Sequence, residues 1–150
     1  MSEEQRKNSK STTSDWSEDE KAAMKERAKE LKAEKANRSK ASDEQGVLEK
    51  IAEMPESERL IAQRLHQMIK DEFPNLYAKT WYGMPAYQLD GKTLLFFQSA
   101  HRFGSRYSTL GFSDTAKLDD GAFWPTSFAL VEMDSKVESK VRDLIRQAIG

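Results

Sequence analysis

The chain has 150 residues, and its 24 Lys and Arg are balanced by 25 Asp and Glu, which leaves no bulk attraction to nucleic acid or to a membrane surface. It has no Cys, which excludes disulfides, thiolate metal sites and a cysteine nucleophile. No apolar run approaches the about 20 residues that span a bilayer, and the polar N-terminal stretch lacks the apolar core of a secretion signal, so we expect a cytoplasmic protein without membrane or nucleic-acid partners.

The first 42 residues differ in composition from the rest of the chain. Residues 1–14 are rich in Ser, Thr, Lys and Glu, and we expect disorder there because they offer too little apolar surface to offset the entropy of ordering. Residues 15–42 are predicted to form a charged helical extension that starts at the capping box Ser17–Glu20 and ends near Ala36. All aromatic residues except Trp16 follow residue 72, so the folded domain is predicted over residues 43–150.

Three helices are predicted in the domain from capping signals and from apolar residues at helical spacing. The first starts at Ser42, which Gln45 follows three residues later, and ends near Pro55. Residues 56–72 repeat apolar side chains with the period of an amphipathic helix. A last helix starts at Asp134 or Ser135 and runs to the end of the chain.

Between the last two helices the apolar period changes to two. The Asp90-Gly91 dipeptide between apolar stretches predicts a two-residue hairpin, whose register pairs Tyr87 with Leu94 and Pro85 with Phe96. In that register both faces of the ribbon are largely apolar, so we expect the second face to be covered or to bind a partner. Further strands are predicted over residues 106–112 and 127–133.

The order of these elements predicts the fold class. Helices, then a run of strands, then one helix indicate an α+β fold, in which helices pack mainly on one face of an antiparallel sheet.

One stretch of the sequence resembles a known family. Residues 79–87 read Lys-Thr-Trp-Tyr-Gly-Met-Pro-Ala-Tyr, and Asp90-Gly91-Lys92 follows before an apolar strand. This pattern resembles the YdhG-like family of domains of unknown function, which is related to the YjbR group and includes proteins described as frataxin-like iron chaperones. The likeness looks closest to an actinobacterial-type branch and covers about residues 43–149. It implies an α+β fold, a cytoplasmic location and a binding or metallochaperone role, with no catalytic residues to carry over.

Aromatic and cationic side chains provide the first functional hypothesis. Aromatic rings together with a few cations can hold a small anionic or aromatic ligand. The candidate ligand-binding residues are Trp81, Tyr82, Tyr87, Lys92, Gln98, His101, Arg102, Arg106, Tyr107 and Trp124. The alternative is that these rings form the core while the cations lie at its solvated rim. We favour a non-enzymatic domain that presents an aromatic-lined sheet surface to a small ligand or a protein partner.

Two other functions are weighed against it. Carboxylates on the helices could bind iron weakly, as a frataxin-like chaperone would, although interspersed cations dilute them; they are Asp43, Glu44, Glu49, Glu53, Glu56, Glu58, Asp71 and Glu72. An enzyme could use His101 with Arg102 and Arg106 on a small anionic substrate. His66 has no second His at helical spacing, which excludes a helical zinc pair, so it is expected to pack its ring at the edge of the apolar face. No cofactor is predicted, iron excepted under the chaperone hypothesis.

Overall fold

The computed structural model describes residues 18–150, and its first helix, α2, runs without a break over Glu18–Ala52. The prediction of two helices that meet near Ser42 is therefore wrong. No Gly or Pro interrupts residues 35–45, so the capping pattern at Ser42 lies inside a continuous helix. The predicted tail over residues 1–14 and the first capping residue, Ser17, lie outside the described residues.

The chain divides into two compact units between residues 39 and 40. Within the described residues, the first unit is a charged and exposed length of α2, with ion pairs between residues three apart such as Arg27 and Glu30. The second unit holds the end of α2 and every other element. Its start at Lys40 lies close to residue 43, where the sequence places the start of the domain.

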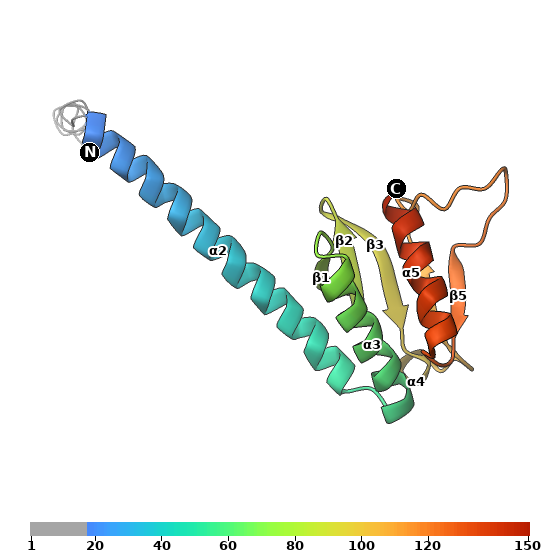
Figure 1. Cartoon of the computed structure of the whole chain (residues 1–150). Coiled ribbons are helices and arrows are strands. Elements are labelled where there is room, and N and C mark those ends of the chain that lie inside the picture. The colour runs from blue at the N-terminus through green and yellow to red at the C-terminus, as the bar shows by residue number, and fades with distance from the viewer. Residues whose placement is uncertain (1–17) are drawn as a thin grey trace, which may run out of the picture. The chain divides into compact units, whose positions relative to one another are not determined.

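Five strands of the second unit form one antiparallel sheet in chain order (Figure 1). The elements after α2 are α3 (Glu56–Glu72), β1 (Tyr77–Trp81), β2 (Met84–Leu89), β3 (Lys92–Gln98), α4 (Ala100–Phe103), β4 (Ser108–Phe112), β5 (Ser127–Leu130) and α5 (Ser135–Ile149). The last two strands are shorter than predicted, while α3 has the predicted bounds. The side chain of Asp134 accepts a hydrogen bond from the Val137 amide at 2.9 Å, which is the predicted N-cap of α5.

A β-bulge in the β2–β3 hairpin decides which side chains enter the core. The turn is as predicted, because Asp90 and Gly91 both have positive φ, 52° and 81°, as a type I′ turn requires. However, Tyr87 pairs with Leu95 rather than with Leu94, so the predicted register is wrong beyond the first pairs. The extra residue, Leu94, lets two consecutive leucines be buried opposite Tyr87 and reverses the faces of all later residues of β3.

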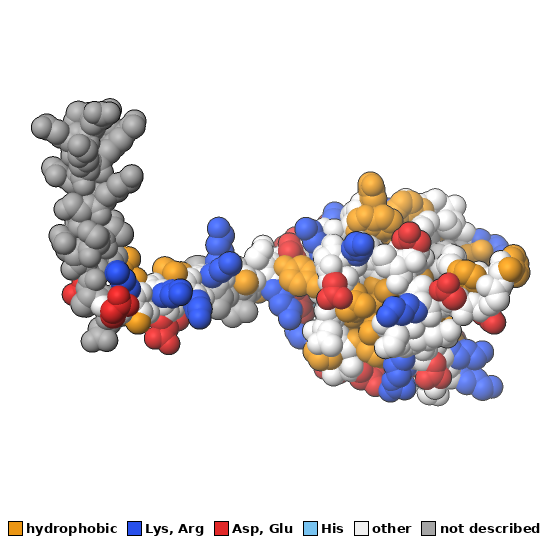
Figure 2. All heavy atoms as spheres, turned by 90° about the horizontal axis from the view of Figure 1, so that it is seen from above, with side chains coloured by type: hydrophobic (Ala, Val, Ile, Leu, Met, Phe, Trp, Pro, Cys, Tyr) orange, Lys and Arg blue, Asp and Glu red, His pale blue; other side chains and the backbone are white. Residues whose placement is uncertain are grey.

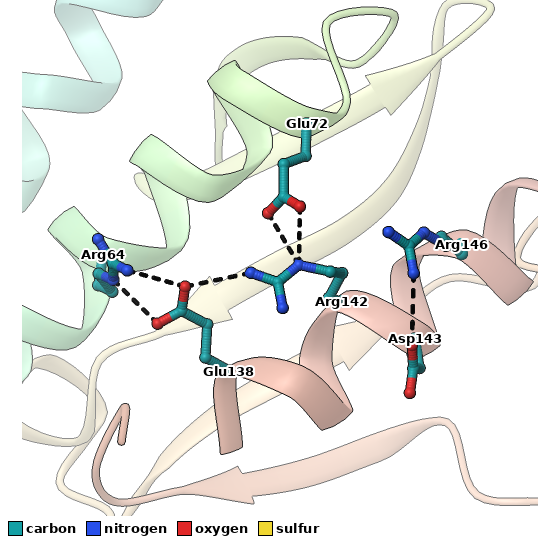
Figure 3. A network of polar contacts seen from close by, with 6 residues as sticks. All are labelled: Arg64, Glu72, Glu138, Arg142, Asp143 and Arg146. Atoms are coloured by element: carbon teal, nitrogen blue, oxygen red, sulfur yellow. Dashed lines mark hydrogen bonds and ion pairs between the residues drawn. The ribbon is translucent and has the colours of Figure 1, made fainter. Parts of the chain in front are cut away.

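The sheet face that carries Tyr87 and Phe97 packs against the helices. Its side chains share one hydrophobic core with apolar residues from the end of α2, from α3 and from α5. The helices α3 and α5 lie side by side across this face (Figure 1), linked by ion pairs from Glu138 to Arg64 at 2.9 Å and from Glu72 to Arg142 at 2.8 Å (Figure 3). The predicted α+β class, with helices mainly on one face of the sheet, is confirmed.

The opposite face of the sheet, here called the outer face, carries Trp81, Phe96, Gln98, Thr109 and Ala129. The rings of Trp81 and Phe96 lie 5.2 Å apart, and the Phe96 ring covers Gly111 so closely that a Cβ there would overlap it. The bulge has moved Leu95 and Phe97 away from this face. Met84 and Ala86 share it and are buried outside the main core, so the outer face is apolar around Trp81 and Phe96 and mainly polar elsewhere. The predicted second apolar face is thus present in part, with Phe96 on it in place of Leu95 and Phe97.

Some hydrophobic side chains remain on the surface of the second unit. Figure 2 shows several such groups on one face, separated by charged side chains. The most exposed large ones are Phe123, Tyr82 and Val131. None of the helices in the described part of the chain is long and apolar enough to cross a membrane.

Candidate functional site

A cavity of about 350 Å³ lies where β2 begins and β3 ends, and we call it the α4 pocket. Four segments meet there: the α2–α3 junction, the turn between β1 and β2, the end of β3, and α4. Its residues are Lys50, Glu53, Met54, Pro55, Gly83, Met84, Pro85, Phe97, Ser99, His101, Arg102 and Phe103. This volume lies at the lower end of the range of small-molecule sites.

The lining of the α4 pocket combines apolar and cationic groups. Met54, Pro85 and Phe97 are buried and contribute apolar side chains, whereas His101 and Arg102 are exposed. Lys50 adds a second full positive charge, partly offset by Glu53 at 3.5 Å. Such a lining can take an apolar or aromatic body against the buried side chains and an anionic group against the cations.

The β1–β2 turn accounts for the glycine at position 83. Tyr82 and Gly83 both have positive φ, 49° and 73°, so this hairpin also turns through a two-residue loop of left-handed residues. The Arg102 guanidinium donates a hydrogen bond to the Gly83 carbonyl oxygen, and a Cβ at residue 83 would overlap that guanidinium. The turn and α4 therefore hold Arg102 over the pocket between them.

The buried carboxylate of Glu58, on α3, holds the start of α4 in place. One oxygen of Glu58, Oε1, accepts hydrogen bonds from the His101 amide at 2.7 Å, the Ser99 hydroxyl at 3.2 Å and the Ser108 hydroxyl at 3.3 Å. Ser108 in turn accepts a hydrogen bond from the Ala100 amide at 3.1 Å. Glu58 thus caps the start of α4 from α3 and determines where His101 and Arg102 stand.

A second polar cluster lies on the helix-covered side of the sheet, beside a cavity of about 240 Å³. His66 Nδ1 lies 2.9 Å from the Tyr87 hydroxyl, and His66 Nε2 lies 3.1 Å from Glu44 Oε1, which also accepts a hydrogen bond from Lys70 at 2.9 Å. Burial raises the pKa of Tyr87 far above its usual range, and the nearby Glu44 carboxylate adds to this. The phenol therefore stays protonated, and the two ring nitrogens of His66 link it to the Glu44 carboxylate.

This cluster predicts a pH dependence of stability. The hydrogen bonds from Lys70 and then His66 lower the pKa of Glu44 in the folded chain. Its carboxylate therefore stabilises the fold above the pKa that it has in the unfolded chain, and this stabilisation is lost as the pH falls through the lower, folded value. Measured by urea unfolding between about pH 6 and pH 3, Glu44→Gln should lose less stability than the parent chain.

The matched control is Glu49→Gln, which removes an exposed carboxyl from the same helix. It should follow the parent curve. If Glu44→Gln and the parent lose the same stability over this range, the Glu44 cluster does not contribute as described.

The structure brings only some of the ten sequence-predicted site residues to the α4 pocket. His101 and Arg102 line it, and Tyr82 stands in the turn beside it. Trp81 and Gln98 lie on the outer face, where the Trp81 ring contacts Tyr82 at 4.8 Å.

The other five lie elsewhere in the second unit. Arg106 and Tyr107 follow α4 in the chain and are exposed, and the Arg106 guanidinium carbon lies 5.1 Å from the centre of the Tyr107 ring. Tyr87 is buried under the helices. Lys92 starts β3, at the end of that strand away from α4, and Trp124 packs half-buried against the core.

The sequence did not indicate the roles of three residues: Lys50 in the α4 pocket, Glu58 beneath α4 and His66 in the second polar cluster. Lys50 and Glu58 appeared among dispersed helix charges, and His66 was expected only to pack its ring, whereas both its nitrogens are hydrogen-bonded. Glu58 and His66 have partners more than 20 residues away, and Lys50 meets the other cations of the pocket only through the fold, so spacing carried no signal for these roles.

No protein-family model, curated protein or solved structure compared with the chain matches it. The YdhG-like resemblance is thus carried by the sequence motif alone.

Proposed function

We propose that the domain binds a small anionic molecule with an apolar or aromatic part in the α4 pocket. The observation that carries this proposal is the convergence of Lys50, His101 and Arg102, from α2 and α4, on one cavity with buried apolar walls. The anionic group would lie against Arg102 and Lys50, and the apolar part against Met54 and against Phe103, which is 44 % exposed.

The α4 pocket contains residues of the motif that resembles the YdhG-like family. Tyr82 and Gly83 form the left-handed turn that receives Arg102, and Met84 and Pro85 form a wall of the pocket. Four consecutive residues of the motif, Tyr82 to Pro85, therefore lie at the proposed site. This supports, as a proposal, both membership of that family and a binding role.

Binding is proposed in preference to catalysis and to iron transport. The enzyme hypothesis used His101 with Arg102 and Arg106, but Arg106 does not line the pocket. Among residues 18–150, no group of three His, Asp or Glu side chains could hold a metal ion. Several carboxylates of the iron hypothesis have partners within the fold: Glu44 with Lys70, Glu58 with α4 and Glu72 with Arg142.

The test is a chemical-shift titration of the full chain with four probes: acetate, inorganic phosphate, benzoate and phenyl phosphate. We expect the two aromatic probes to bind more tightly, by about tenfold or more, because each buries a ring against the apolar wall. Their shifts should be confined to residues of the α4 pocket. Arg102→Gln, which keeps a donor for the Gly83 carbonyl but removes the charge, should weaken binding by about 10- to 100-fold.

Arg106→Gln is the matched control, because it removes an exposed guanidinium four residues away that does not line the pocket. It should leave the affinity within about twofold of the parent chain. The proposal is wrong if none of the four probes shifts the pocket residues, or if the two arginine variants lose the same affinity.

A further inference from the structure

Among residues 18–150, no strand adjoins the outer edge of β5, which stands last in the strand order. The Phe112 amide donates to the Thr126 carbonyl oxygen at 2.8 Å, so the backbone groups of residue 126 face β4. Because these groups alternate along an antiparallel strand, those of residues 128 and 130 also face β4. The N–H and C=O groups of Ser127, Ala129 and Val131 therefore face the open edge.

A groove of about 590 Å³ runs beside this edge, between β5 and α5. Its walls are mainly apolar: Leu110, Phe128, Leu130, Val137, Val141 and Leu144. The helical layer buries Leu130 but leaves Phe128, Val137 and Leu144 partly exposed along the groove. Val131, directly after β5, is 75 % exposed, and Phe123, in the loop before β5, is 92 % exposed. An open edge, an apolar groove and exposed apolar side chains together mark an interaction surface.

We propose that β5 pairs antiparallel with β5 of a second copy of this chain, so that two sheets join into one across a two-fold axis. Only residues whose backbone groups face the edge can form the new hydrogen bonds, and the register centred on Ala129 uses all three, with Ser127 opposite Val131 of the partner subunit. In this register Phe128 lies beside Leu130 of the partner subunit, on the side of the grooves. Both grooves then close over one shared apolar layer.

The charges on α5 favour a second copy over an unrelated partner. Lys140 and Asp143 stand one turn apart on the rim of the groove, and two-fold symmetry sets α5 antiparallel to its copy. An axis that passes between the two residues places Lys140 of each copy opposite Asp143 of the partner subunit. Asp143 already lies 3.6 Å from Arg146 on an exposed surface, and Lys140 would approach it from the other side (Figure 3).

The test is sedimentation equilibrium of the full chain over a range of concentrations up to about 1 mM. The parent chain should move from 17.2 kDa towards twice that mass. Ala129→Pro should remain at the monomer mass, because proline blocks pairing at the open edge while the backbone group that it removes has no bond to β4. Its circular dichroism spectrum checks that it is folded.

A second pair of variants does not alter the strand. Lys140→Glu and Asp143→Lys, each alone, should raise the dimer dissociation constant about tenfold or more, since like charges then face each other twice. A mixture of the two variants restores opposite charges at both positions and should regain the parent affinity. A parent chain that stays at 17.2 kDa, or a dimer that Ala129→Pro and the charge variants leave unchanged, would overturn the proposal. Neither result depends on whether the α4 pocket binds a ligand.

Discussion

Replacing Phe97 by Ala should lower the free energy of unfolding by about 3–5 kcal/mol, the range found when a fully buried aromatic side chain is truncated. Phe97 is 0 % exposed and lies on the core face of β3 near the end of that strand, where Leu110 stands opposite on β4. Its removal would leave a cavity between sheet and helices that rigid neighbours cannot fill. Urea unfolding followed by circular dichroism measures the loss.

The neighbouring Phe96 gives the matched control, since the two residues differ only in the face that they occupy. Phe96 is half-buried on the outer face, against Trp81 and over Gly111. Phe96→Ala should cost about 1–2 kcal/mol, because part of the ring surface stays in water in the folded chain. The unshifted register, in which Phe96 shares the face of Tyr87, requires the opposite order of the two effects.

This comparison also locates the limit of what the sequence could predict about the sheet. The Asp90-Gly91 turn and the Asp134 cap depend on residues next to each other, and both were predicted. The bulge at Leu94 depends on how well two consecutive leucines fill space beneath the helices. In a strand with consecutive apolar residues, the unshifted register and the register shifted by one residue both place apolar side chains on the core face. Only packing against the helices selects between them.

The long α2 helix shows the same limit at a helix end. Ser42 followed by Gln45 has the pattern of a capping box, but a capping pattern starts a helix only where the preceding chain is not already helical. The preceding residues are themselves good helix formers. The helix-forming residues before Ser42 therefore continue the helix through the capping pattern. As a result, the domain boundary falls inside one continuous helix.

The candidate site could be predicted only in part. His101 and Arg102 stood out because they follow an apolar strand close to aromatic residues. Their convergence with Lys50 could not be foreseen, since it needs the end of α2 to meet the end of β3. The roles of Glu58 and His66 also depend on distant partners, which the fold brings within hydrogen-bonding distance. Composition and spacing indicated some of the candidate residues. Which of them lie close enough to form one site depends on the tertiary fold.

Replacing Glu58 by Ala should lower the free energy of unfolding by about 3 kcal/mol, because it leaves several buried donors without an acceptor. Glu58 is only 8 % exposed, and its one oxygen accepts from the His101 amide and from the hydroxyls of Ser99 and Ser108. Since Ser99 and the His101 amide lie at the start of α4, the loss should also loosen the segment that carries Arg102. We therefore expect faster amide exchange at His101 and Arg102, measured by hydrogen exchange under native conditions.

Glu56→Ala is the control that separates this role from a general effect of acidic residues at the start of α3. Glu56 lies in the same first turn but is exposed, so its loss removes only the interaction with the helix dipole, about 0.3–1 kcal/mol. Glu58→Gln, which retains an acceptor oxygen, should fall between the two variants. Equal losses for Glu56→Ala and Glu58→Ala, or unchanged exchange at α4 in the latter, would show that Glu58 does not hold α4 in place.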